Sequence, residues 1–437
     1  MVARFLTAGL ILTLVQPAFG QEGRVLVGAD LLFSERLDLL QGKRVGLVTN
    51  HTALLSDGRH VADAIAGRDD MELAALLCPE HGIRGDTTGL IPDGMDQQTG
   101  VPIYSLYGKT KKPTAPMLEG VDLLVFDIQD VGARFYTYIS TLGHVMGAAA
   151  KKEIPVVVLD RPNPITGTRV AGPVAEDSML SLMVPIRKDS ITGTWVEDPL
   201  GEDSTLSLVA FAPIPIMHGM TVGELALMYN GQGWLEDGLR AHLTVIRMKN
   251  WTRNLWYDET GLQWVKPSPN MPTLNTAVVY PGTCLFEGVK VSEGRGTDRP
   301  FEYIGAPWLN TAQVIELLEN MSLPGVQFEP IQFTPTKRPQ NVTAPEYANQ
   351  GCNGIMLEVT EREEYQAVRT GIVLLWAILM VHPDRLEWKE NRFDRLAGTT
   401  TVRSMLERGR DPDQVIDSWN ERLRAFEEVR KKYLLYP

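Results

Sequence analysis

The stretch Val121-Asp122-Leu123-Leu124-Val125-Phe126-Asp127 is the clearest strand signal in the chain and decides its fold class. It is a short apolar run that ends in a carboxylate, which is typical of a strand buried on both faces. Further apolar runs and helical patterns alternate along the first half of the chain, at 43–48, 61–66, 71–78, 138–151 and 154–159. Strands that alternate with helices predict an α/β fold with a parallel sheet covered on both faces.

Polar side chains suited to chemistry follow these predicted strands. Because an open parallel sheet binds ligands outside the carboxyl ends of its strands, we expect these side chains to gather along one edge. Carboxylates, imidazoles and amides that converge in this way indicate a site. The residues are Asn50, His51, Glu80, His81, Asp127, Gln129, Asp130, Asp160 and Arg161.

The second half of the chain has a different character from about Lys249 onward. Three tryptophans, Trp251, Trp256 and Trp264, precede the proline-rich loop 267–273, and proline at this density disfavours a helix or a central strand. Clustered tryptophan fits either core packing or stacking against sugar rings. Beyond this loop, strands and helices mix without strict alternation, which favours an α+β class. We expect strands at 279–285, 326–333 and 354–359 and helices at 311–320, 367–380 and 415–433.

Two features lie between these halves. Glu176–Leu182 is echoed by Glu202–Leu208, and this near-repeat suggests an inserted hairpin. Thr221 with Glu224 three residues later forms a capping box, which predicts the start of a helix.

The first twenty residues are expected to be a signal peptide. Arg4 is followed by the apolar run 5–15 and then by Ala18-Phe19-Gly20, which has the small residues that a signal peptidase reads. The run is too short to cross a membrane, and no later stretch approaches 18 apolar residues. We therefore expect an exported protein, periplasmic or extracellular, without a transmembrane segment after signal removal.

Composition narrows the classes of partner. The net charge of −12 gives no basic footprint for nucleic acid or anionic lipid. Cys78, Cys284 and Cys352 are far apart and lack metal-ligand spacing, so we expect them to be buried. One bridge with a free thiol remains open for an oxidising compartment. The oligomeric state does not follow from the sequence.

The sequence lacks the motifs of dinucleotide binding, of nucleotide phosphate binding and of serine nucleophiles. The first strand is not followed by G-x-G-x-x-G, and the chain has neither a P-loop nor a G-x-S-x-G elbow, so we expect no cofactor. A metal held by His51, His81, Asp127 and Asp160 remains a minor alternative. Carboxylate chemistry is favoured, because burial of Glu80 in its apolar-flanked loop would stabilise the protonated form that a general acid requires.

The chain resembles one known family along nearly all of its mature length. The motifs that carry the resemblance, in order, are 45–52 (VGLVTNHT), 79–85 (PEHGIRG), 126–138 (FDIQDVGARFYTY), 159–164 (LDRPNP), 218–221 (HGMT), 267–272 (PSPNMP) and 287–300. Together they look like the NamZ-type exo-β-N-acetylmuramidases, formerly a domain of unknown function. The segment 178–212 is longer than the family pattern, so its role stays open.

The resemblance implies a fold and a reaction. After the signal peptide expected at 1–20, it implies a Rossmann-like catalytic domain, which we place at 21–250, and a smaller C-terminal domain, at 251–437, that completes the cleft. The implied reaction removes N-acetylmuramic acid from the non-reducing end of peptidoglycan fragments. The glutamate of the family's P-E-H-G motif is its proposed catalytic residue and corresponds to Glu80.

On this basis the predicted site has two groups of residues. Glu80, His81 and Asp127 are the predicted catalytic residues. Arg134, Arg295 or Arg299 is a candidate for pairing with the lactyl carboxylate of muramic acid. The predicted substrate-binding residues are Asn50, His51, Gln129, Arg134, Tyr136, Asp160, Asn270, Glu287, Glu293 and Arg295.

Two other functions compete with this one. A non-catalytic binder of cell-wall fragments would use the same cleft and tryptophans, and a metal-dependent hydrolase would use the histidines and aspartates. Retention or inversion of configuration depends on the spacing of carboxyl groups in space, which the sequence does not show.

Overall fold

The structure is a computed structural model that describes residues 23–85, 92–107, 110–180, 186–188, 195–197, 209–338 and 344–437. A seven-stranded sheet forms its first part, in the order β11-β6-β5-β1-β2-β4-β3. All neighbouring pairs are parallel except β3 with β4. The strands are β1 (Arg44–Thr49), β2 (Glu72–Cys78), β3 (Gly94–Met95), β4 (Pro102–Ser105), β5 (Leu123–Asp127), β6 (Val156–Leu159) and β11 (Leu243–Ile246). The expected parallel sheet is confirmed.

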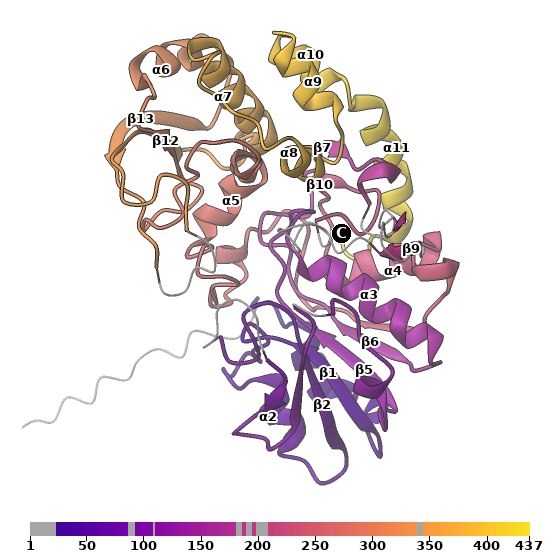
Figure 1. Cartoon of the computed structure of the whole chain (residues 1–437). Coiled ribbons are helices and arrows are strands. Elements are labelled where there is room, and N and C mark those ends of the chain that lie inside the picture. Colours follow the sequence, from indigo (N-terminus) through magenta and orange to yellow (C-terminus); the bar gives the residue numbers. More distant parts are fainter. Residues whose placement is uncertain are drawn as a thin grey trace, which may run out of the picture.

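Helices cover both faces of this sheet (Figure 1). Successive side chains of a strand point to opposite faces. Leu47 of β1 therefore joins the apolar cluster under α1 (Gly28–Glu35) and α2 (Val61–Ala66). Its neighbour Val48 joins the cluster under α3 (Tyr138–Lys151) and α4 (Val222–Gln232).

The strand order places a crevice at the carboxyl edge of the sheet. From β1 the chain adds β2 and β4 on one side, and then β5, β6 and β11 on the other. The order therefore reverses between β1 and β5, and ligands of such sheets bind where it reverses. The loop after β1 begins at Asn50, and the loop after β5 begins at Ile128.

The second part is a smaller α+β unit. Three antiparallel strands lie in the order β12-β14-β13, namely β12 (Tyr303–Ala306), β14 (Cys352–Val359) and β13 (Val326–Phe333). Helices α5, α6 and α7 share one apolar core with this sheet. Their bounds, with those of the later helices, are α5 (Leu274–Thr283), α6 (Thr311–Glu319), α7 (Ala367–Val381), α8 (Glu390–Ala397), α9 (Thr401–Glu407), α10 (Pro412–Asp417) and α11 (Asn420–Arg430).

One predicted strand is wrong. Residues 279–285 lie in α5 and the short 3-10 helix that follows it (Cys284–Gly288), rather than in a strand. Thr273 caps α5 by accepting a hydrogen bond from the Thr276 amide at 3.1 Å. A short apolar run is ambiguous between a strand and a buried helix, and here the tertiary contacts of α5 decide the outcome.

The predicted helix at 415–433 is also wrong as one element. It is divided into α10, α11 and a terminal 3-10 helix (Lys431–Tyr433). The Ser418 hydroxyl donates to the Val415 carbonyl at 2.6 Å, close to the point of division. A serine side chain that bonds the backbone in this way competes with a continuing helix.

Two shorter pairs complete the first part. Strands β7 (Ala171–Val174) and β10 (Pro215–Met217) pair antiparallel, as do β8 (Ile186–Lys188) and β9 (Trp195–Glu197). The β8–β9 pair lies between the two near-repeats, of which the second, 202–208, is outside the described residues. The expected signal peptide is also outside them.

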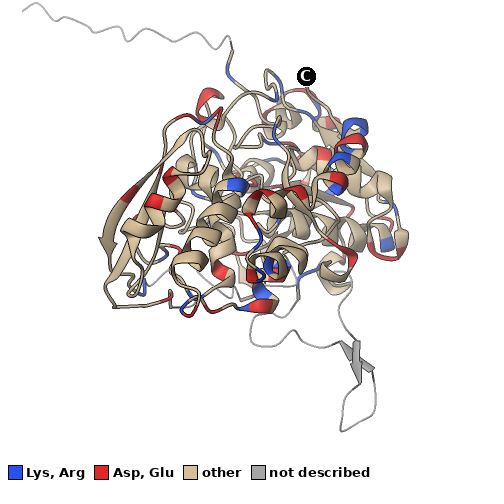
Figure 2. Cartoon of the chain, turned by 90° about the horizontal axis from the view of Figure 1, so that it is seen from above, with Lys and Arg blue, Asp and Glu red and all other residues tan. Residues whose placement is uncertain are grey.

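Three general observations complete the picture. Cys78, Cys284 and Cys352 are buried, as expected, and all three are free thiols. In Figure 2, Lys and Arg are interspersed with Asp and Glu rather than gathered on one element. Of the helices in the described part of the chain, none combines the length and the apolar character needed to cross a bilayer.

Candidate active site

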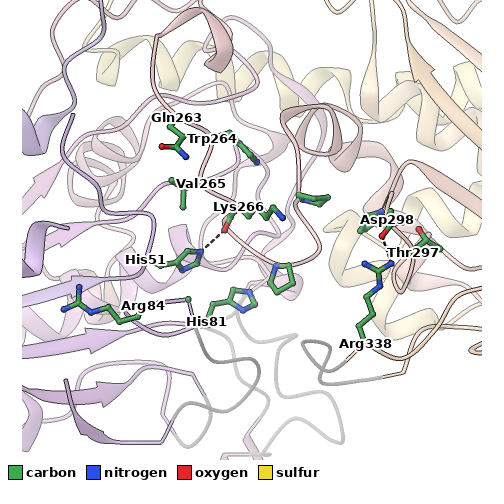
Figure 3. Close-up of a pocket in the computed structure, with 14 residues that line it drawn as sticks. His51, His81, Arg84, Gln263, Trp264, Val265, Lys266, Thr297, Asp298 and Arg338 are labelled. Atoms are coloured by element: carbon green, nitrogen blue, oxygen red, sulfur yellow. Dashed lines mark hydrogen bonds and ion pairs between the residues drawn. The ribbon is translucent and has the colours of Figure 1, made fainter. Parts of the chain in front are cut away.

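A cavity of about 690 Å³ lies between the two parts of the chain (Figure 3). Loops after β1 and β2 form one side of it, and the loop 263–272 and residues of the second part form the rest. The volume is typical of a small-molecule site. The lining residues are His51, His81, Arg84, Gly85, Gln263, Trp264, Val265, Lys266, Pro269, Pro272, Thr297, Asp298, Pro300 and Arg338.

The turn after β2 places His81 in the lining of this cavity, and Glu80 directly precedes it in the chain without belonging to the lining. His81 has a φ of 75°, a left-handed conformation that is uncommon for a residue with a side chain, and Gly82 follows with a φ of 69°. Such backbone strain clusters at functional sites. The turn brings the His81 Nε2 to 4.0 Å from the Glu80 Oε1, so the carboxyl group lies beside a ring that lines the cavity.

Glu80 is held in an environment that favours its protonated form. Burial raises the pKa of its carboxyl group, while a hydrogen bond from Tyr107 and the charge of Arg295 act in the opposite direction. The side chain keeps 25% of its exposure, so it is still accessible from solvent. A carboxyl group with a raised pKa in a cleft is suited to donate a proton near neutral pH.

The two histidines of the cavity differ in their surroundings. Burial, followed by the charge of His51, lowers the pKa of His81 to about 4, so its ring is neutral at neutral pH. The His51 Nε2 donates to the Lys266 carbonyl at 2.7 Å, because a carbonyl can only accept. That bond joins the loop after β1 to the loop 263–272.

Charged residues of the second part approach Glu80 from the other side. Arg295 donates to Glu293 and lies 3.8 Å from Glu287, which Arg392 also contacts. Burial raises the pKa of Glu287; Arg295 and Lys389 oppose this, while Glu293 and Glu80 add to it. Four predicted site residues, Glu80, Glu287, Glu293 and Arg295, are therefore brought together from opposite parts of the chain.

The structure does not place Asp127 in this group, so its catalytic role stays a prediction. Its two carboxylate oxygens accept from the Arg161 Nε at 2.5 Å and Nη2 at 2.8 Å. Arg161 also donates to the Leu54 carbonyl at 3.0 Å. Asp127 is fully buried, and its bonds to Arg161 hold the ends of β5 and β6 together.

Asp160 is likewise bonded to groups of the protein itself, and it does not belong to the cavity lining. Its Oδ1 accepts from the Arg161 and Gly223 amides, and its Oδ2 accepts from the hydroxyls of Thr221 and Tyr436. Burial raises its pKa to about 7, although these hydrogen bonds act against the rise. Asp160 thus fixes the start of α4 and the end of the chain.

Arg134 is a third predicted residue whose hydrogen bonds are made within the protein. It is fully buried and donates to the backbone carbonyls of Pro173, Ile214 and Leu396 at 2.6–2.9 Å. These contacts join the first part to α8, and none of them faces the cavity lining. Arg299 pairs with Glu302 at 3.2 Å.

The remaining predicted residues support the loops of the site. The Asn50 Oδ1 accepts from the Thr52 amide and hydroxyl, and the Gln129 Nε2 donates to the Asp130 and Pro162 carbonyls. The ring of Tyr136 packs edge-on against Tyr138 with centroids 4.9 Å apart. Asn270 lies between Pro269 and Pro272, which both line the cavity.

Sequence reasoning missed several residues of the site. Tyr107 follows β4, so the strand-end rule that found Glu80 also applied to it. Lys266 and Arg338 lie in loops without any local pattern, so the sequence held no signal for them. Of the clustered tryptophans, Trp264 lines the cavity, whereas Trp251 and Trp256 are buried in core clusters.

The four residues of the alternative metal site, His51, His81, Asp127 and Asp160, do not come together around one point. Asp127 and Asp160 have their oxygens occupied by the partners described above. Within the described ranges, no group of three or more His, Cys, Asp or Glu side chains is arranged to hold a metal ion.

Fold and site together define a class: a two-part α/β protein with a carboxyl-rich site at the edge of a parallel sheet, closed by a smaller α+β unit. The first part matches the family Exo-beta-N-acetylmuramidase NamZ, N-terminal, over residues 45–188 and 180–275, and the second matches its C-terminal counterpart over 278–436. The chain belongs to this family, which confirms the resemblance. The domain boundary at 250/251 stays a prediction.

Individual relatives agree with this assignment. The Peptidoglycan beta-N-acetylmuramidase NamZ of Bacillus subtilis (strain 168) is 42% identical over 416 residues, which are 94% of this chain and 92% of the relative. Two crystal structures of DUF1343 family proteins from Bacteroides fragilis NCTC 9343 are each 32% identical. One has a TM-score of 0.82 and covers 95% of this chain and 100% of its own, and the other has a TM-score of 0.72 and covers 94% and 99%.

Proposed function

We propose that this chain is an exo-acting glycoside hydrolase that releases N-acetylmuramic acid from the non-reducing end of peptidoglycan fragments. The observation that carries the proposal is the placement of Glu80, a carboxyl group with a raised pKa, beside an inter-part cavity in a member of this family. The B. subtilis relative, named as a peptidoglycan muramidase, gives the substrate class.

In this proposal Glu80 is the acid/base residue. Protonated Glu80 donates its proton to the glycosidic oxygen as the bond to the leaving sugar breaks. Glycoside hydrolysis generally uses two carboxyl groups, and Glu287 is a second one within electrostatic reach of Glu80. The neutral His81 ring lies beside Glu80, where it positions the carboxyl group or the reacting water.

The proposal includes export of the protein. The support is the charged, apolar and small-residue pattern of residues 4–20. An exported muramidase meets peptidoglycan fragments in the periplasm or outside the cell, where it would act in cell-wall recycling.

Glu80→Gln tests the catalytic assignment. We expect kcat/KM on an aryl β-N-acetylmuramide to fall by about 10²–10⁴-fold, because a glutamine of the same shape has no acidic proton to give. The melting temperature should stay close to that of the unchanged protein. Glu119→Gln, which removes an exposed carboxylate of the first part, is the matched control and should keep full activity.

The competing functions predict other results. Release of muramic acid by Glu80→Gln at a near-normal rate would refute the role of Glu80. A non-catalytic binder would hold the muramide without forming product even as the unchanged protein. A metal-dependent hydrolase would lose activity with a chelator and regain it with one divalent ion.

A further inference from the structure

The cavity contains one cation whose charge no described carboxylate neutralises. Arg84 pairs with Asp63 at 2.7 Å and with Asp96 at 2.8 Å. Arg338 pairs with Asp298 at 2.8 Å. Lys266 is exposed, and within the described part of the chain its ammonium group forms no ion pair.

Lys266 is held in place through its backbone while its side chain stays available. Its carbonyl accepts the hydrogen bond from the His51 Nε2 at 2.7 Å, which fixes the Lys266 backbone next to the loop after β1. Figure 3 shows the side chain extending from that bond toward the side of the cavity that carries Asp298. Asp298 is already held by Arg338, so it does not supply the missing negative charge.

We propose that the Lys266 ammonium group binds a carboxylate of the ligand in this cavity. This inference rests on the proposed function, in which the ligand carboxylate is the lactyl group of N-acetylmuramic acid. A lysine is a compact point charge, and its hydrogen bond to a carboxylate is charge-assisted and therefore stronger than a neutral one. Lys266 would thus distinguish a muramic acid unit from a sugar of the same ring that lacks the acid.

The arginines named from the sequence are less suited to this task. Arg134 is buried and bonded to three carbonyls. Arg299 pairs with Glu302. Arg295 bridges Glu287 and Glu293, so a ligand carboxylate would have to displace one of these partners.

The experiment compares two substrates across four proteins. The substrates are an aryl β-N-acetylmuramide and the same compound with its lactyl carboxylate methylated. The proteins are the unchanged chain, Lys266→Gln, Lys266→Arg and Lys249→Gln, the last being an exposed lysine outside the cavity lining. Binding of N-acetylmuramic acid and of N-acetylglucosamine to each protein is measured by calorimetry, so that the readout does not depend on turnover.

We expect Lys266→Gln to lower kcat/KM on the free acid by about 10- to 100-fold, the range for a hydrogen bond to a charged group. Its kcat/KM on the methyl ester should be unchanged. Lys266→Arg should recover most of the loss, and Lys249→Gln should behave like the unchanged protein. In calorimetry, Lys266→Gln should lose the preference for N-acetylmuramic acid over N-acetylglucosamine.

Three results would overturn the assignment. Equal losses on acid and ester would mean that Lys266 acts on structure rather than on the carboxylate. An unaffected Lys266→Gln would show that the Lys266 ammonium group does not bind the carboxylate. If the unchanged protein shows no preference for N-acetylmuramic acid in calorimetry, Lys266 has no such role. Failure of the proposed function is separate, because it would appear as the absence of turnover while the binding preference persists.

Discussion

At the residue scale, one buried turn pushes two neighbouring side chains toward their neutral forms. Burial raises the pKa of Glu80 and lowers the pKa of His81 to about 4. The same desolvation acts in opposite directions because it disfavours the charged form of each group. The turn therefore places a carboxyl group whose protonated form is favoured beside a neutral imidazole, which suits proton donation.

The hydrogen bond from Tyr107 gives a pH prediction. It stabilises the ionised carboxylate, so it lowers the pKa of Glu80. Tyr107→Phe removes it, and the pKa of Glu80 should rise further. The proposed acid works only when protonated, so activity is lost as the pH rises through the pKa of Glu80. The alkaline limb of the pH–kcat/KM profile should therefore move to higher pH in Tyr107→Phe.

Tyr104→Phe serves as the control, since Tyr104 lies on β4 close to Tyr107 in the chain and does not act on the pKa of Glu80. An alkaline limb that stays in place or moves to lower pH in Tyr107→Phe would show that another group controls it.

At the scale of elements, close contact between α5 and α7 explains why the sequence suggested a strand at 279–285. A Cβ on Gly282 would lie 2.0 Å from the Ala367 carbonyl oxygen, and one on Gly371 would lie 2.4 Å from the Gly282 carbonyl oxygen. The two helices therefore meet backbone to backbone. Val278, Val279 and Leu285 are buried in the core that α5 and α7 share. Because α5 is apolar on all sides there, its sequence lacks the alternation of apolar and polar residues that marks a helix, and the run resembles a buried strand.

Gly282→Ala should destabilise the protein by about 2 kcal/mol or more, because overpacking against backbone forces the helices apart. Urea unfolding measures the change. Gly351→Ala is the matched control, since no atom lies within 4 Å of its added methyl group. If Gly282→Ala unfolds at the same urea concentration as the control, the close helix contact is contradicted.

Elements of the first part were largely predictable, because each strand is a short apolar run and ends in polar residues. The runs at 43–48, 71–78 and 154–159 lie on β1, β2 and β6. The uses of the polar residues were less predictable. Asp127 and Glu80 are both carboxylates at strand ends, and only the distant Arg161 makes one of them structural. No pattern in the sequence near Asp127 indicates that Arg161 will pair with it.

At the scale of the whole molecule, the two parts are joined by buried bonds as well as by the cavity. Helix α11 packs against β7, and its Phe426 enters the core under α3 and α4. Arg430 donates to the Gly167 and Gly219 carbonyls. These contacts lie outside the cavity lining, and they hold the two sides of the cavity in position relative to each other.

Arg134→Ala tests this joining. It leaves three buried carbonyls without their donor, so we expect the free energy of unfolding to fall by about 3 kcal/mol or more. The KM of the protein that remains folded should not change, because Arg134 does not face the ligand. Chemical unfolding and steady-state kinetics measure the two quantities.

The comparison is with Arg410→Ala, an exposed arginine whose loss should leave both quantities unchanged. A stable Arg134→Ala protein with a raised KM would restore the substrate-binding role predicted from the sequence.

The bond between Tyr436 and Asp160 has a consequence for how the protein is made. These residues are 276 positions apart, yet the Tyr436 hydroxyl donates at 2.5 Å to a carboxyl group that directly follows β6 of the first sheet. A nascent chain leaves the ribosome with the first half exposed long before the tyrosine is translated. Until then, this buried carboxyl lacks one of its donors and α11 is absent from the α3–α4 core. Final closure of the first part therefore waits for residues 420–436, and the protein becomes competent only once α11 has docked.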